Sequence, residues 1–125
     1  MNSITYKNPD GISGFCGFGQ FVVAKAEDLY IADDNVPFEK LAVVEPVACV
    51  INSINNANVE FGDDVLVIGG GTMGMLHVML AHMKGANVIL SEPVEERRKK
   101  ALELGANAVI DPTKVDVAEE VKRLT

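Results

Sequence analysis

The stretch from Val65 to Met83 carries no formal charge, and it constrains the fold more than any other part of the sequence. Its length approaches the roughly 20 apolar residues with which one helix crosses a bilayer. However, three successive glycines, Gly69 to Gly71, interrupt the stretch, and His77 and His82 would place polar rings in lipid. The stretch therefore predicts two elements, a short strand and a helix joined by a glycine turn, rather than a membrane span.

The rest of the C-terminal half repeats this alternation of strand and helix. The continuously apolar run 65–68 predicts a strand that is covered on both faces of a parallel sheet. Further strands are predicted at 88–91 and 108–110, and the predicted helices run from about 72 to 84, from Pro93 to Gly105, and from 117 to 124. The order β-α-β-α-β-α predicts an α/β fold, in which helices cover both faces of a doubly wound parallel sheet.

The first 60 residues give weaker signals. Two short strands are predicted at 20–26 and 28–34, and helical spacing begins at Pro37. Pro46 interrupts that spacing, and we expect it to occupy the first position of a second helix, where its missing N–H group does no harm.

The glycine turn carries the main functional signal. Gly69, Gly71 and Gly74 form a G-x-G-x-x-G pattern between a predicted strand and a predicted helix. In dinucleotide-binding proteins the first glycine permits the turn, the second admits a pyrophosphate, and the third lets helix and strand pack closely. The phosphates would bind the free N–H groups of the first helical turn, which includes Thr72 and Met73.

An acidic residue supports the same interpretation. Glu92 ends the second predicted strand, where a carboxylate can bind the hydroxyl groups of an adenosine ribose and repel a 2′-phosphate. This position favours NAD over NADP, with Arg97 as a further candidate cofactor contact. The same constellation also suits an S-adenosylmethionine-binding domain, which stays open as an alternative.

Charge and cysteine content narrow the functional classes. With 11 basic and 18 acidic residues the net charge is −7, which disfavours binding to nucleic acid or to an anionic membrane surface. The first residues show no secretory leader, so we expect a cytoplasmic protein. Cys16 and Cys49 form no C-x-x-C motif, and two reduced thiols are expected.

Residues 14–54, 62–76 and 85–112 resemble the middle of a zinc-dependent medium-chain alcohol dehydrogenase. The Glu45-Pro46 pair within "VEPVACVINS" is similar to the polyol and threonine dehydrogenase branch of that family. The resemblance implies that residues 1–46 are a remnant of the GroES-like catalytic domain. It also implies that residues 47–125 are the first half of an NAD(P)-binding Rossmann domain.

The resemblance implies that Glu45 belongs to the coordination sphere of a catalytic zinc ion. The other zinc ligands of the family, a cysteine and a histidine, would precede Met1, and one carboxylate cannot hold zinc alone. His77 and His82 do not replace them, because a spacing of five turns the two rings apart on a helix. We therefore assign no catalytic residue and expect the isolated chain to be inactive, with weak dinucleotide binding at best.

The resemblance implies an intact enzyme that transfers hydride between a small alcohol or polyol and a nicotinamide cofactor. A complete dinucleotide domain has the strand order 3-2-1-4-5-6. Because the first half of such a domain holds strands 1 to 3 alone, strand 1 would here be an open edge of the sheet. An open edge invites pairing with another chain, so a homo-oligomer is expected. A non-catalytic assembly module that uses the same edge is the second alternative.

Overall fold

The computed structural model describes residues 26–125, which belong to two compact units, 1–35 and 36–125. In the first unit a 3₁₀ turn, η2 (Ala26–Asp28), is followed by a segment without regular structure. The strand predicted at 28–34 is therefore wrong: a strand needs a ladder of hydrogen bonds, and the described residues of this unit form none. The strand predicted at 20–26 lies outside the described residues, apart from Ala26.

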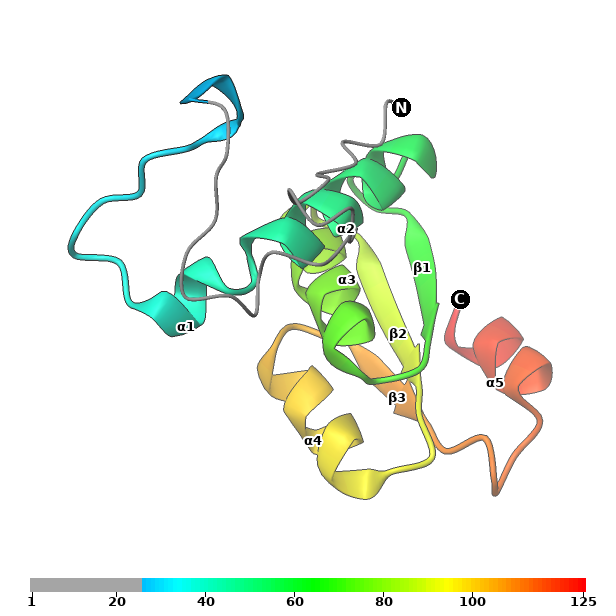
Figure 1. Ribbon diagram of the computed structural model, residues 1–125. Helices are drawn as coiled ribbons and strands as arrows, with labels where there is room; N and C mark the ends of the chain where they lie inside the picture. The colour runs from blue at the N-terminus through cyan, green and yellow to red at the C-terminus, as the bar shows by residue number, and fades with distance from the viewer. Residues whose placement is uncertain (1–25) are drawn as a thin grey trace, which may run out of the picture. The chain divides into compact units, whose positions relative to one another are not determined.

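The second unit is built on a parallel sheet of three strands, β1 (Asp64–Ile68), β2 (Asn87–Ser91) and β3 (Ala108–Ile110). Figure 1 shows β2 between the other two, in the order β1-β2-β3. Val67 pairs with Leu90, and Leu90 pairs with Val109, so that the three strands end at the same edge of the sheet. The predicted strand positions and the parallel arrangement are confirmed.

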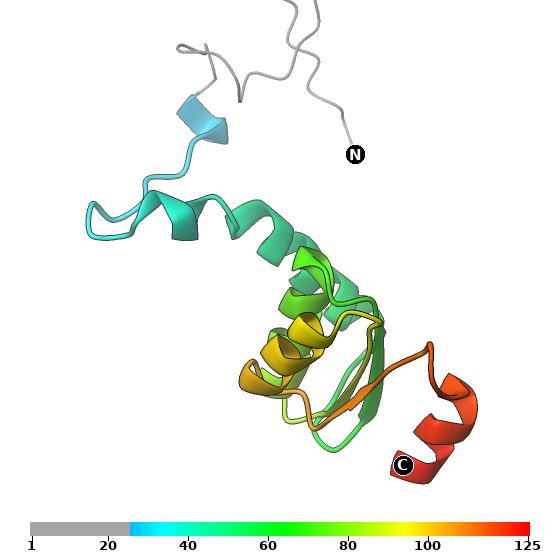
Figure 2. The same ribbon diagram turned by 90° about the horizontal axis from the view of Figure 1, so that it is seen from below.

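Helices cover both faces of this sheet, as expected for a doubly wound fold. The helices α3 (Thr72–Met83) and α4 (Glu95–Glu103) pack on one face, and α5 (Val117–Leu124) lies on the other (Figures 1 and 2). The α/β, partial Rossmann fold predicted from the sequence is confirmed. No helix within residues 26–125 is long and apolar enough to cross a membrane.

Two further helices, α1 (Phe38–Leu41) and α2 (Val44–Asn56), precede the sheet in the chain. Pro46 is the third residue of α2, not the first as predicted. The helix tolerates it there because the N–H groups of the whole first turn have no partner within the helix. The predicted boundary between 46 and 47 falls inside α2, and the division into two domains stays a prediction.

Burial differs sharply between the first two strands. Val88, Ile89 and Leu90 of β2 are at most 1% exposed, whereas Leu66 and Ile68 of β1 are 37% and 80% exposed. The prediction that β1 is covered on both faces is therefore wrong. Its apolar character does not decide its burial: β1 lies at the edge of the sheet, and α5 packs against β3 at the other edge.

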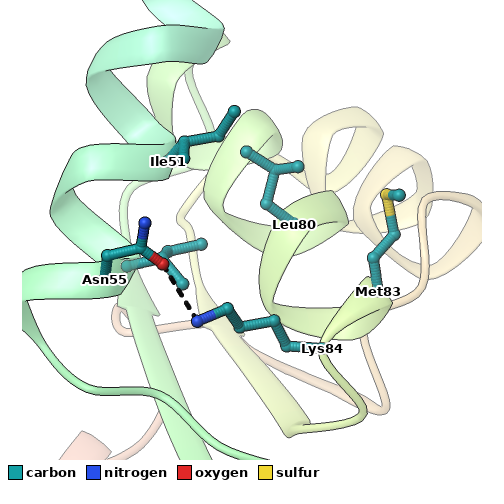
Figure 3. A pocket seen from close by; sticks show the side chains of 6 residues that line it. Ile51, Asn55, Leu80, Met83 and Lys84 are labelled. Atoms are coloured by element: carbon teal, nitrogen blue, oxygen red, sulfur yellow. Dashed lines mark hydrogen bonds between the residues drawn. The ribbon is translucent and has the colours of Figure 1, made fainter.

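The face of α2 that carries Val50 and Ile54 packs against α3. Between these two helices lies a hollow of about 260 Å³ (Figure 3), lined by Ile51, Ile54, Asn55, Leu80, Met83 and Lys84. The Lys84 ammonium group donates to Asn55 Oδ1 at 3.0 Å and to the Val59 carbonyl at 3.2 Å. Lys84 thus joins the end of α3 to the end of α2, which indicates a packing feature rather than a binding site.

Candidate functional site

The turn that follows β1 needs a glycine at its first position. Gly69 has a φ of 95°, a conformation that side-chain-bearing residues rarely adopt, and its N–H donates to the Ser91 carbonyl at 2.8 Å. This bond extends the β1–β2 ladder one residue past β1, so the turn starts from a fixed position at the carboxyl end of the sheet.

The other two glycines of the motif meet different requirements. A Cβ atom on Gly74 would lie 1.8 Å from the Gly69 carbonyl oxygen, so the close approach of α3 to the turn excludes any side chain there. A Cβ atom on Gly71 would meet nothing within 4 Å, and the φ of Gly71 is an ordinary −76°. Nothing in the described chain therefore requires a glycine at 71, but its absent side chain leaves space in front of the turn.

The first turn of α3 faces that space with N–H groups that have no partner among residues 26–125. Gly71 is the N-cap residue and offers no side-chain cap, and the first helical hydrogen bond runs from Met75 N–H to the Gly71 carbonyl at 2.9 Å. The N–H groups of Thr72, Met73 and Gly74 therefore stand at the positive end of the helix dipole. Such a helix end can bind a phosphate.

Glu92 lies beside this turn, at the end of β2, and is only 3% exposed. Its Oε2 accepts a hydrogen bond from the Gly70 N–H at 2.5 Å, and its Oε1 accepts one from the Val94 N–H at 2.8 Å. These bonds, the one from Val94 first, lower the pKa of Glu92 against the opposing effect of burial, with a smaller contribution from Arg97 and Arg98. Glu92 is thus an ionised, buried carboxylate at the glycine turn.

The two arginines at the start of α4 have different surroundings. Arg97 is more than half exposed, and its Nη1 lies 3.8 Å from Glu92 Oε2. Arg98 is 12% exposed and donates to the Glu92 and Pro93 carbonyls, both at 2.7 Å. Its Nη2 also lies 3.1 Å from Asp111 Oδ2, which follows β3.

Sequence reasoning missed Arg98, Asp111 and Gly70 as parts of this site. Asp111 accepts hydrogen bonds from the Thr113 hydroxyl and N–H groups, and with Lys114 and Arg98 nearby its pKa falls to about 2. Asp111 directly follows β3, just as Glu92 directly follows β2, so both lie at the same edge of the sheet. This position in the sequence could have identified Asp111 as part of the site. The structure thus brings the predicted residues Gly69, Gly71, Thr72, Met73, Gly74, Glu92 and Arg97 to one edge of the sheet.

Glu45 has a different environment, in the exposed first turn of α2. Its Oε1 accepts a hydrogen bond from the Cys49 thiol at 3.3 Å, and this bond and the carboxylate charge raise the pKa of Cys49. Cys49 is itself exposed, and the face of α2 that packs on α3 carries Val50 and Ile54 instead.

The described residues do not fit a zinc ion. A catalytic zinc site takes three protein ligands, and within residues 26–125 no three His, Cys, Asp or Glu side chains are grouped to hold a metal. The His77 ring is engaged elsewhere, with Nδ1 2.8 Å from the Met73 carbonyl and Nε2 3.1 Å from Ser53 Oγ. His77 thus bridges α3 and α2.

A groove of about 300 Å³ runs beside β1 and the start of α3, lined by Leu66, Val67, Ile68, Met73, Gly74 and His77. It adjoins the glycine turn through Met73 and Gly74. The exposed side chain of Ile68 makes this part of the surface apolar.

Comparison with known proteins agrees with this arrangement. A family model described as zinc-binding dehydrogenase matches residues 72–125. An (R,R)-butanediol dehydrogenase from Neisseria gonorrhoeae is 35% identical over 90% of this chain and 32% of its own length. An L-threonine 3-dehydrogenase from Caldanaerobacter subterraneus is 33% identical over 92% of this chain and 33% of its own length. The chain belongs to the zinc-dependent medium-chain alcohol and polyol dehydrogenase family.

The chain spans about a third of the length of the curated relatives it matches. A solved structure of the zinc-binding dehydrogenase type from Sinorhizobium meliloti, with NADP bound, is 40% identical over 59% of this chain and 22% of its own, with a TM-score of 0.58. The family and the fold expected from the sequence are therefore confirmed, and this related structure contains NADP.

Proposed function

We propose that the unit 36–125 binds the adenosine and pyrophosphate portion of NAD. The observation that carries this proposal is the turn itself, where Gly69 and Gly74 are required by the chain and Gly71 is not. The fold itself does not require a glycine at position 71. A glycine there, beside uncapped helical N–H groups, would let a pyrophosphate approach the turn closely. The N–H groups of Thr72, Met73 and Gly74 would bind the pyrophosphate, and Glu92 would bind the ribose.

The preference for NAD over NADP belongs to the same proposal. A buried, ionised Glu92 would repel a 2′-phosphate, and this supports NAD. Arg97 and the NADP-bound relative support the alternative, because an exposed guanidinium can bind a phosphate. We give Glu92 the greater weight because its carboxylate is held at the turn by two hydrogen bonds, whereas Arg97 makes one long contact.

The whole protein, in this proposal, is a dehydrogenase of a secondary alcohol or polyol, in which bound NAD supplies the hydride acceptor. Glu45 would join the zinc coordination sphere only together with ligands from outside the described residues. The isolated chain should therefore show no alcohol oxidation. Turnover of butane-2,3-diol or threonine by the purified chain, with NAD and zinc, would contradict this.

A homo-oligomer that pairs through β1 is a further part of the proposal. The edge strand carries Ile68 at 80% exposure, and the apolar groove lies beside it. Light scattering after size exclusion should show a dimer or larger species, and Ile68→Lys should shift it toward a monomer. The proposed lack of binding to nucleic acid or to anionic membranes rests on the net charge of −7. The cytoplasmic location stays a prediction.

Calorimetric titration of the chain with NADH, NADPH and S-adenosylmethionine tests the cofactor assignment. We expect NADH to bind most tightly, and Glu92→Ala to weaken it by about tenfold or more, as loss of a charged hydrogen-bond partner does. Glu96→Ala is the matched control, since it removes a nearby exposed carboxylate of α4. Preference for S-adenosylmethionine, or no binding by a folded sample, would contradict the proposal.

A further inference from the structure

Glu92 makes contacts that recognition of a ribose alone does not explain. Both of its carboxylate oxygens accept main-chain hydrogen bonds, one from Gly70 in the glycine turn and one from Val94 before α4. The two bonds join segments on either side of β2: the β1–α3 turn and the β2–α4 loop. Glu92 therefore holds together the two loops that border the expected adenosine site.

The contact between Gly70 and Glu92 depends on the absence of a side chain at position 70. The G-x-G-x-x-G pattern leaves the residue between its first two glycines free, yet this chain has a glycine there as well. A Cβ atom on Gly70 would lie 3.0 Å from both Cγ and Oε2 of Glu92, so even alanine would press on the carboxylate. The absence of a side chain at position 70 thus lets the Gly70 N–H and the Glu92 carboxylate meet.

Because the Glu92 carboxylate is buried, its two hydrogen bonds restrict where it can lie. A carboxylate that is 3% exposed is costly unless its oxygens are hydrogen-bonded or paired with a cation. The described residues include no buried side-chain oxygen or nitrogen without a partner, and Arg98 further fixes the loop by donating to the Glu92 carbonyl at 2.7 Å. The carboxylate therefore cannot move away from the Gly70 N–H without leaving a buried charge unsatisfied.

We propose that Glu92 is a positioning residue that clamps the Gly70 N–H to the Val94 N–H and so holds the glycine turn in its cofactor-binding shape before any cofactor is bound. This inference rests on the proposed function but adds a role to it. A carboxylate has about four acceptor positions, so the ribose hydroxyls can bind while both main-chain bonds remain. Glu92 then acts on the pyrophosphate through the turn as well as on the ribose directly.

Amide hydrogen exchange of the cofactor-free chain, followed residue by residue by NMR, is the first test. In the wild-type chain the Gly70 and Val94 amides should exchange about tenfold or more slowly than the uncapped Thr72 and Met73 amides, because a hydrogen bond to a charged acceptor contributes about that factor. Glu92→Ala should remove this protection at both amides, whereas Glu92→Gln keeps one acceptor oxygen and should remove it at one of them. Glu96→Gln should leave both amides protected. Equal exchange of Gly70 and Met73 in the wild-type chain would overturn the clamp without any variant.

Binding of two nucleotides separates positioning from direct contact. NADH and its analogue that lacks the 2′- and 3′-hydroxyl groups of the adenosine ribose should both bind about tenfold more weakly to Glu92→Gln. If Glu92 served the ribose alone, the analogue would bind the variant and the wild type equally, and the inference would be wrong. If the wild type bound neither nucleotide, the proposed function would fail, while the exchange experiment would still decide whether the clamp exists.

Discussion

The glycine turn and the first turn of α2 are the two places where the sequence predicts a bound group, and they are built very differently. At the glycine turn a buried carboxylate, two main-chain donors and an uncapped helix end lie within one strand-helix-strand unit. At the start of α2 one exposed carboxylate has one exposed thiol beside it. The cofactor half-site is thus formed by neighbouring elements, whereas a metal site needs ligands from segments far apart in the sequence.

This contrast predicts large effects of substitution at the glycine turn. Gly74→Ala would drive a methyl group into the Gly69 carbonyl, and the free energy of unfolding should fall by about 3 kcal/mol or more. Gly71→Ala, the matched control, fills open space and should lower it by at most about 1 kcal/mol, while it weakens NADH binding. Urea denaturation measures the first effect and calorimetry the second; equal destabilisation by both variants would contradict the distinction.

Acid should weaken the clamp at Glu92. Because the pKa of Glu92 is lowered from its ordinary 4.5, the unfolded chain takes up the proton first on acidification. The stabilisation is complete above about pH 4.5 and is lost as the pH falls through the native pKa. At pH 7 we expect Glu92→Gln to lower the free energy of unfolding by about 2 kcal/mol.

The difference between wild type and Glu92→Gln should narrow as urea denaturation is repeated from pH 6 down to pH 3. The pH dependence from Asp111, whose pKa of about 2 follows mainly from the Thr113 hydroxyl, should persist in both proteins. A constant difference across this range would argue against a titrating carboxylate at the clamp.

A smaller effect is expected where α2 and α3 are joined by His77. Ser53→Ala removes one hydrogen bond and should lower the free energy of unfolding by about 1 kcal/mol. His77→Ala also loses the contact with the Met73 carbonyl and should lower it by more. The double variant should cost less than the sum of the two, which a double-mutant cycle detects. Simple additivity would mean that the two side chains do not interact in solution.

The smallest effects are expected at Glu45 and Cys49. Because both side chains are exposed and paired only with each other among the described residues, Glu45→Ala and Cys49→Ala should leave the urea midpoint unchanged. Zinc titration by calorimetry should also give the same result for Glu45→Ala and wild type. Zinc binding that Glu45→Ala abolishes would show that this chain forms a metal site by itself.

Much of the unit 36–125 could be predicted from local sequence. β3 was located to the residue, and the ends of α3 and α5 were close, because apolar periodicity and turn residues act over a few positions. The G-x-G-x-x-G motif and Glu92 were recognised in the same way, as a pattern between one strand and the next. Pro46 and the strand at 28–34 were misplaced because a helix start and a strand depend on partners that the pattern does not show.

The sequence by itself determined the order of strands and helices, the glycine turn and the acidic residue that follows β2. Only the tertiary structure decided that Gly71 faces open space, that Glu92 holds Gly70, and that Arg98 rather than Arg97 fixes the loop. It also decided that Leu66 and Ile68 of β1 are exposed where β2 is buried, although β1 is the more apolar of the two strands. The physical reason is that burial and hydrogen-bond partners are properties of neighbours in space, which a residue acquires only when the sheet and its helices have assembled.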